Sequence, residues 1–154
     1  MSKRTLNFKL ITAILATGLM SFSGVVVETA MNITFPILMK EFNVTTSYVQ
    51  WLTTGVLLVV AVFVPISSFL KQRFATKHLF IASNLLFLVG LIVDIIAPSF
   101  PILLMGRLLQ GIGTGIALPL MFNIILEQSP VDKIGFLMGI GTLVTAVAPA
   151  IGPT

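Results

Sequence analysis

The sequence predicts an all-α membrane protein, a bundle of five transmembrane helices. Of its 154 residues 56% are hydrophobic and only 9% are charged, and its mean hydropathy is +1.09. A soluble domain carries about 25% charged residues, so lipid must be the solvent for most of this surface. The apolar runs lack period-two alternation and are far longer than the roughly 10-residue strands of a membrane β-barrel, which favours helices.

Charges and prolines separate the first two apolar runs, each close to the about 20 residues that cross a bilayer. The first run, 10–33, holds one charged residue, Glu28, and we expect Pro36 to end its helix. The second run, 51–70, starts beside Tyr48 and Trp51, an aromatic pair typical of a membrane interface. Both runs are therefore predicted to be membrane spans.

Three further runs complete the predicted bundle. The third covers 78–97 and is followed by Pro98 and Pro101, which mark a turn. The fourth covers 102–125 and the fifth 134–154. Because the fifth run stops without a polar flank, we expect the chain to be an amino-terminal fragment of a longer membrane protein.

Basic residues predict how the bundle is oriented. The termini and connections alternate between the two sides of the membrane. One side holds a single basic residue, Lys40, and the other side holds seven: Lys3, Arg4, Lys9, Lys71, Arg73, Lys77 and Lys133. Loop Lys and Arg residues stay in the cytoplasm, so the amino terminus is predicted to be cytoplasmic. Since these cations are spread between apolar runs and do not form one solvated face, a nucleic-acid partner is not expected.

The residue inventory excludes several kinds of site. The chain has no cysteine and a single histidine, His78, so it offers neither a thiolate metal site nor an imidazole cluster. No serine–histidine pair or carboxylate dyad can be assembled from the spans. We therefore expect no metal, no cofactor and no enzymatic activity.

Two ionisable residues lie inside predicted spans, Glu28 and Arg107. Such residues cost at least about 2.5 kcal/mol each to insert, which makes them candidates for function. Each is about five residues from the same predicted face of the membrane, so the two charges can neutralise each other or face one water-filled cavity. Glu28 could exchange a proton in competition with substrate. The alternatives are a purely structural pair, or a Glu28 that snorkels to the interface.

Polar neighbours accompany both charges. Asn32 follows Glu28 by four positions and Gln110 follows Arg107 by three, so each shares a helix face with its charge. Asn32 and Gln110 are candidates for lining a substrate cavity, and interhelical hydrogen bonding is an equal alternative. Asp94, near the outer end of the third run, is interpreted as an interfacial residue in contact with solvent, with a proton-relay group as the less favoured alternative.

Small residues and prolines predict packing and movement. Gly111 and Gly115 form a G-x-x-x-G pattern, which lets another helix approach closely. The fifth run contains, among its glycines and prolines, Gly139, Pro149, Gly152 and Pro153. Prolines inside a span kink it and free carbonyls, as in a moving or gating helix; ordinary kinked packing is the alternative.

The fourth run carries the strongest likeness to a known family. Arg107, Gln110, Gly111 and Gly113 match the pattern R-x-x-Q-G-x-G, and Pro119 follows. With this pattern the chain resembles the amino-terminal half of a major facilitator superfamily transporter, most closely the multidrug:proton antiporters of the fourteen-helix branch, the EmrB/QacA type. The resemblance implies that Arg107 takes part in proton coupling and that Pro119 belongs to the packing and gating residues.

Other parts of the chain match the family in part. Thr29, Asn32 and Pro36 fit L-D-x-T-x-x-N-x-A-L-P, but Val27 stands at the aspartate position and Glu28 comes one residue later. That offset turns the carboxylate by about 100° around a helix, so the proton-site role of Glu28 is inferred and not matched.

Two further patterns of the family lie in the loop after the second run and in the fifth run. The loop pattern P-x-x-G-x-L-x-D-R-x-G-R-R has Gln72 in place of the aspartate that latches the two halves of such transporters. The pattern G-x8-G-x3-G-P is met by Gly139, Gly152 and Pro153, with Ala148 at its second glycine.

The resemblance implies a function for the whole chain, 1–154, as a partial amino-terminal transporter domain. Its expected role is proton-coupled efflux of drugs or other amphiphilic small molecules across a bacterial cell membrane. Its expected partners are the lipid bilayer, protons, an amphiphilic substrate, and a sixth helix and second half. Two alternatives remain open: a major facilitator for another metabolite, and a small membrane protein that does not transport and uses its G-x-x-x-G face to bind partner helices.

Overall fold

The computed structural model describes residues 8–151, which form six α-helices and one short 3-10 helix. Five segments are long and apolar enough to cross a membrane, which confirms the predicted five-helix architecture. The elements are α1 (Phe8–Glu41), α2 (Thr46–Val49), α3 (Trp51–Arg73), α4 (Thr76–Ile96), α5 (Phe100–Gln128), η1 (Val131–Lys133) and α6 (Ile134–Ile151). The predicted residues Lys3, Arg4, Gly152 and Pro153 lie outside the described part of the chain.

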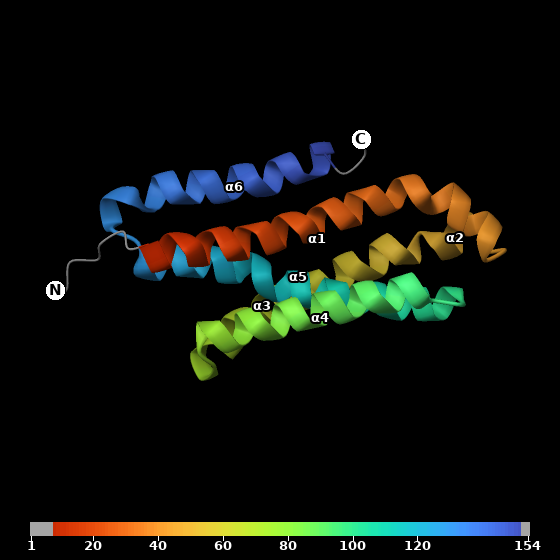
Figure 1. The fold of residues 1–154 in the computed structure, drawn as a ribbon, viewed down its shortest axis with the longest axis horizontal. Coiled ribbons are helices and arrows are strands. Elements are labelled where there is room, and N and C mark those ends of the chain that lie inside the picture. The colour runs from red at the N-terminus through yellow and green to blue at the C-terminus, as the bar shows by residue number, and fades with distance from the viewer. Residues whose placement is uncertain (1–7, 152–154) are drawn as a thin grey trace.

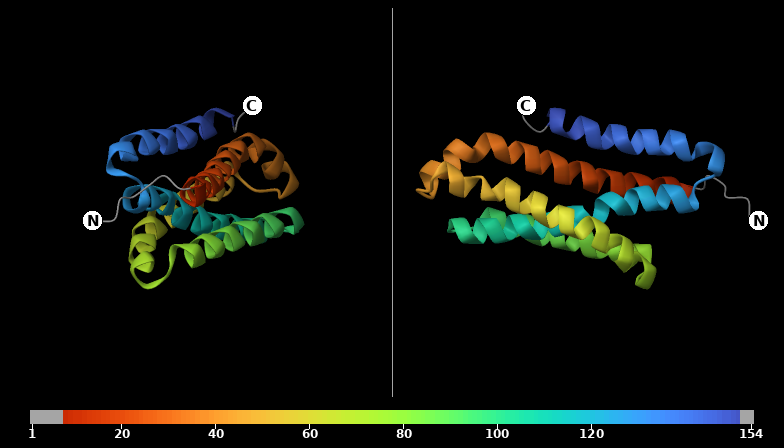
Figure 2. Two further views of the ribbon diagram at one scale, coloured as in Figure 1. Left: turned by 60° about the vertical axis from the view of Figure 1, so that its left-hand side comes forward. Right: turned by 180° about the vertical axis from the view of Figure 1, so that it is seen from behind.

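The helix α5 forms the centre of the bundle (Figure 1). It packs against α3 and α4 on one side and against α1 on the other, and it is the most deeply buried of the five spans. The helix α6 lies along α1 at the edge of the bundle, as both views in Figure 2 also show. Because α6 also contacts α5, side chains on α5 meet all four other spans.

Glycines set the close approach of α4 and α5. A methyl group at Gly113 would lie 2.6 Å from the backbone oxygen of Ser83, and one at Gly90 would lie 2.6 Å from the backbone oxygen of Gly106. In lipid, helices gain little from the hydrophobic effect when they associate, so van der Waals contact between backbones stabilises the pair. Gly111 and Gly115 lie on another face of α5, where residues 56–63 of α3 pack against them.

Apolar clusters fill the two ends of the bundle. One, with α2 and the start of α5, is built on Val49, Leu52, Phe100 and Leu103. The other joins α1, α4 and α5 and contains Leu10, Ile14, Leu79, Ile116, Leu120, Met121, Ile124 and Ile125. Arg107 and Gln110, two of the buried polar residues, lie on α5 between the parts of the helix that belong to these clusters.

The prediction that Pro36 ends the first helix is wrong, because α1 continues to Glu41. Proline removes only one helical hydrogen bond, and the residues around and beyond it, Phe35, Leu38 and Met39, gain packing against the first apolar cluster. The helix ends where Asn43 adopts a φ of 55°, and the Val44 amide then donates to the Met39 carbonyl at 3.2 Å. This is the Schellman pattern of a helix carboxyl terminus.

The longer α1 changes the depth of Glu28. The sequence placed this residue about five positions from the helix end, but about 13 positions separate it from Glu41. At 1.5 Å per residue that is about 20 Å along the axis. Glu28 therefore lies in the interior of α1, far from its carboxyl end. The other four predicted spans agree with their helices to within three residues at each described end.

Candidate functional site

Arg107 is the central residue of a polar group inside the bundle. It lies on α5, and only 1% of its surface is exposed. Its Nη1 donates a hydrogen bond of 2.8 Å to Oε1 of Gln110, which is 3% exposed. The two residues meet because positions three apart share a helix face.

Gln110 connects Arg107 to a carboxylate on the neighbouring helix. Its Nε2 donates to Oδ2 of Asp94 on α4 at 2.5 Å. There is room for this contact because Gly90 and Gly106 lie where the two helices cross, and the Asp94 carboxylate packs directly on Gly106. Arg107, Gln110 and Asp94 thus form a continuous chain of hydrogen bonds between α4 and α5.

The interpretation of Asp94 as an interfacial residue in contact with solvent is wrong. Its side chain turns into the α4–α5 contact, and its Oδ1 is buried. A periodic signal was present in the sequence, since Ser83, Phe87, Gly90 and Asp94 recur every three or four residues and the first three are buried. An aspartate that continues such a face points toward a neighbouring helix.

Glu28 approaches the same group from α1. One turn before it, Gly24 packs against Thr114 of α5, so Glu28 lies on the face of α1 that turns to α5. The charges of Asp94 and Glu28 both act on Arg107. Within residues 8–151, neither Asp94 nor Glu28 forms an ion pair shorter than 4.0 Å, and hydrogen bonding connects Arg107 through Gln110 to Asp94 and not to Glu28.

Several buried atoms of the group lack a hydrogen-bond partner. They are Nε and Nη2 of Arg107 and Oδ1 of Asp94. A buried charge is expensive unless it is paired and hydrogen bonded. The group therefore has donors free for a further acceptor, and any change in the charge of a nearby carboxylate changes its energy.

Comparison with known proteins identifies the family. The sequence profile of the Major Facilitator Superfamily matches residues 10–154. The chain belongs to this superfamily.

Relatives of this superfamily member include proteins named for resistance and for export. Lincomycin resistance protein LmrB of Bacillus subtilis is 46% identical over 153 residues, which cover 99% of this chain and 32% of that protein. Multidrug export protein EmrB of Haemophilus influenzae is 31% identical over 144 residues, 94% of this chain and 28% of that protein. The chain thus spans about a third of the length of these relatives. No solved structure gave a significant match.

The family confirms two predictions from the sequence. The chain is a multi-pass membrane protein of a transporter superfamily and not an enzyme, and its likeness to the multidrug branch extends over almost its whole length. Metal binding gains no support from the described residues, because between positions 8 and 151 no three His, Asp or Glu side chains gather at one point.

Asn32, the other predicted cavity residue of this superfamily member, lies apart from the hydrogen-bonded chain of Arg107. It is exposed, and its Oδ1 accepts a hydrogen bond of 3.1 Å from the Thr53 hydroxyl, which links α1 to α3. Interhelical hydrogen bonding is one of the two roles that the sequence suggests for Asn32, the other being contact with substrate. A role for Asn32 in binding substrate stays a prediction.

The predicted packing and gating residues have different surroundings. Gly111 and Gly115 lie against α3, with Pro119 half-buried one turn further along α5. Pro149 is exposed within α6, which remains helical to Ile151. A methyl group at Gly139 would meet no atom within 4 Å in the described part of the chain, so its packing role stays a prediction.

A second polar group lies at the carboxyl ends of α3 and α5. Lys71 forms an ion pair with Glu127 beside a cavity of about 300 Å³, which Ser68, Gln72 and Asn123 also line. Gln72 stands at the position of the family's latch aspartate. No pattern in the sequence marks Glu127, which lies near the end of a span and whose side chain is 61% exposed.

Proposed function

We propose that this chain is the amino-terminal part of a transporter that exports amphiphilic drugs or similar small molecules across a bacterial cytoplasmic membrane in exchange for protons. The observation that carries the proposal is the buried Arg107, which is 1% exposed and has two carboxylates, Asp94 and Glu28, acting on it from separate helices. Ionisable groups kept inside a bundle are typical of ion and proton pathways.

The relatives support the choice of substrate class. Proteins named for lincomycin resistance and for multidrug export match nearly all of this chain, and all of the relatives considered above are bacterial. An amphiphilic molecule suits a site in which a carboxylate lies among apolar side chains, because apolar contact and one charge pair together can hold it. The remainder of the transporter, including a sixth helix and a second half, is proposed to close the site at the membrane midplane.

The exchange would occur at Glu28. When its carboxylate is ionised, the group of Arg107, Asp94 and Glu28 carries two negative charges and one positive charge. A cationic substrate or a proton can balance the excess, so the two compete for one place. Proton uptake from outside then releases the substrate, and proton release to the cytoplasm prepares the site for the next one.

The transport test uses the full-length gene product reconstituted in proteoliposomes. Addition of a lipophilic cation should release protons from the purified transporter, and a pH gradient alone should drive accumulation of the cation. Cation movement that neither releases protons nor responds to the pH gradient would contradict proton coupling. Failure of lipophilic cations to bind at all would favour a facilitator for another metabolite.

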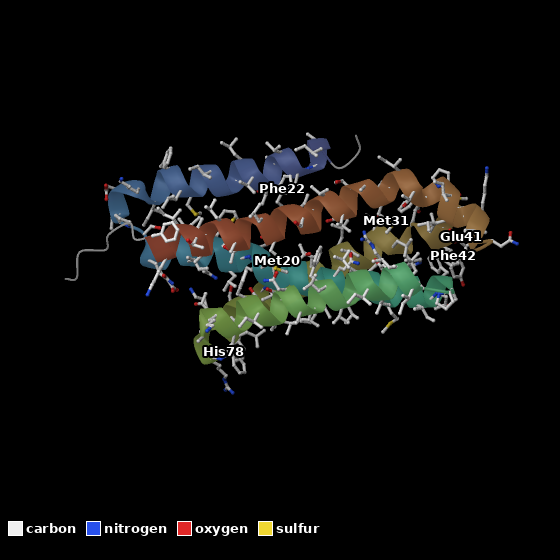
Figure 3. All side chains as sticks on the ribbon, viewed as in Figure 1. Met20, Phe22, Met31, Glu41, Phe42 and His78 are labelled. Atoms are coloured by element: carbon white, nitrogen blue, oxygen red, sulfur yellow. The ribbon has the colours of Figure 1, made fainter. Side chains whose placement is uncertain are left out.

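We also propose that the amino terminus lies in the cytoplasm. Lys71, Arg73 and Lys77 border the turn between α3 and α4, at the end of the bundle where Figure 3 places His78. Glu41 and Phe42 lie at the opposite end, next to Lys40. The excess of cations on the His78 side supports its assignment to the cytoplasm.

The absence of cysteine makes this orientation easy to test. In intact cells, a membrane-impermeant maleimide should label a Glu41→Cys variant at once, and a His78→Cys variant only after the cells are opened. Both positions are exposed in the bundle, so access to the reagent depends on the membrane alone. Labelling of His78→Cys in intact cells would reverse the assignment.

A further inference from the structure

We propose that Asp94 is the fixed counter-ion of Arg107, held through Gln110, and that Glu28 is the exchangeable carboxylate of the group. The inference deepens the proposed function and rests on it. It assigns separate tasks to two carboxylates that act on the same guanidinium, and it gives Asp94 a positioning role that the sequence did not suggest.

The Gln110 amide has a single orientation that suits both of its charged neighbours. Its oxygen accepts from Arg107 Nη1 at 2.8 Å, and its NH₂ group donates to Asp94 Oδ2 at 2.5 Å. The reversed amide would place NH₂ against the guanidinium and oxygen against the carboxylate, and both contacts would be repulsive. The two charges on either side therefore fix the amide, and the amide in turn holds them in register.

The negative charges around Arg107 outnumber its one positive charge. Asp94 of α4 and Glu28 of α1 are the groups whose charges act on it. The helix α3 carries its charges, Lys71 and Arg73, at its far end, and the residues of α6 include none. The other charges of α1 and α4 lie near the helix ends, at Lys9, Lys40, Glu41 and Lys77. One guanidinium thus faces two carboxylates, and it can fully neutralise only one of them.

The two carboxylates differ in how tightly the bundle holds them. The Asp94 carboxylate packs on Gly106 at the crossing of α4 and α5, where backbone meets backbone. Neither carboxylate has an ion pair shorter than 4.0 Å within residues 8–151, but Asp94 accepts a hydrogen bond from Gln110, whereas no side chain of that part of the chain donates to Glu28 on α1. At the nearby α1–α5 contact, a methyl group on Gly24 would meet side-chain atoms of Thr114. Arg107 Nε and Nη2 remain without a hydrogen-bond partner, so they are available when Glu28 is ionised and close.

The test is a pair of double-mutant cycles in the full-length transporter, measured by the thermal midpoint Tm of the purified protein. Asp94→Asn should lower Tm by at least about 5 °C, because it leaves a buried guanidinium without its counter-ion. Adding Arg107→Gln to Asp94→Asn should restore most of the lost Tm. The corresponding cycle of Glu28→Gln with Arg107→Gln should show a much smaller coupling in the substrate-free protein. Asp132→Asn, the same chemical change at an exposed site in η1, is the matched control and should leave Tm unchanged.

Proton release induced by a lipophilic cation provides the functional readout. Glu28→Gln should abolish it while the protein keeps a Tm close to that of the unmodified transporter. The proposal is overturned if Arg107→Gln does not restore Asp94→Asn, or if the Glu28 cycle couples as strongly as the Asp94 cycle. If Asp94→Asn alone yields no folded protein, the yield of folded protein replaces Tm as the measurement. Recovery of folded protein when Arg107→Gln is added would then support Asp94 as the counter-ion of Arg107, and no recovery would overturn it. If the unmodified transporter releases no protons, the proposed function fails, while the two cycles still decide which carboxylate neutralises Arg107.

Discussion

Replacement of Arg107 by methionine should reduce efflux of a lipophilic cation from cells at least tenfold, while the amount of transporter in the membrane stays close to normal. Methionine is similar in length and apolar, so it fills the space of a residue that is 1% exposed. It removes the positive charge that both carboxylates share and the hydrogen bond to Gln110. Without that charge, Asp94 and Glu28 both become neutral by binding protons, and no site for exchange remains.

Two companion variants make the Arg107 result specific. Lys133→Met removes an exposed cation of η1 and should leave efflux unchanged. Arg107→Lys keeps the charge but loses the planar guanidinium that donates to Gln110, so we expect it to retain only a part of the efflux rate. Full, proton-driven efflux by Arg107→Met would remove Arg107 from the coupling group. The rates are obtained from the loss of a fluorescent lipophilic cation from preloaded cells.

The substitution Gly90→Ala should destabilise the bundle by about 1–3 kcal/mol and also reduce efflux, because it overpacks the α4–α5 crossing. The added methyl group would lie 2.6 Å from the backbone oxygen of Gly106 and 2.7 Å from Cγ of Gln110. Neither neighbour can move without separating the helices or displacing the amide that connects Arg107 to Asp94.

Gly135→Ala is the matched control for that prediction. A methyl group at Gly135 would meet no atom within 4 Å in the described residues, and alanine is a better helix former than glycine by about 0.8–1.0 kcal/mol. Its Tm should therefore stay equal or rise, while the Tm of Gly90→Ala falls. Equal Tm values for both variants would contradict the close backbone contact at Gly90.

The sequence was sufficient for the spans and for half of the polar group. Runs of apolar residues must be helical in lipid, because backbone groups there can be satisfied only within the segment. Arg107 and Gln110 stood out because a polar side chain in a span is costly wherever it points. Their surroundings could not be predicted, since the depth of a residue along one helix does not say which neighbour it faces.

Asp94 and Pro36 illustrate what was missed. Asp94 lies close to the end of α4, where distance to the interface suggests solvent, but its position on the Gly90 face turns it toward α5. Pro36 normally marks a boundary, but packing of the residues around it kept α1 helical as far as Glu41. In both cases, contact with a second helix outweighed a local signal in one segment.

The glycine contacts also determine which parts of the bundle can shift relative to one another. At Gly90 and Gly113 the backbones of α4 and α5 touch, and at Gly111 and Gly115 the backbone of α3 comes almost as near to α5. Sliding these three helices past one another would break backbone contacts that no rotamer change can restore, so we expect them to move together. The helix α1 meets α5 through side chains at Gly18 and Gly24, which can adjust. A rocking motion would therefore carry Arg107 and Asp94 together and change their separation from Glu28, which turns a mechanical displacement into a change in electrostatic energy.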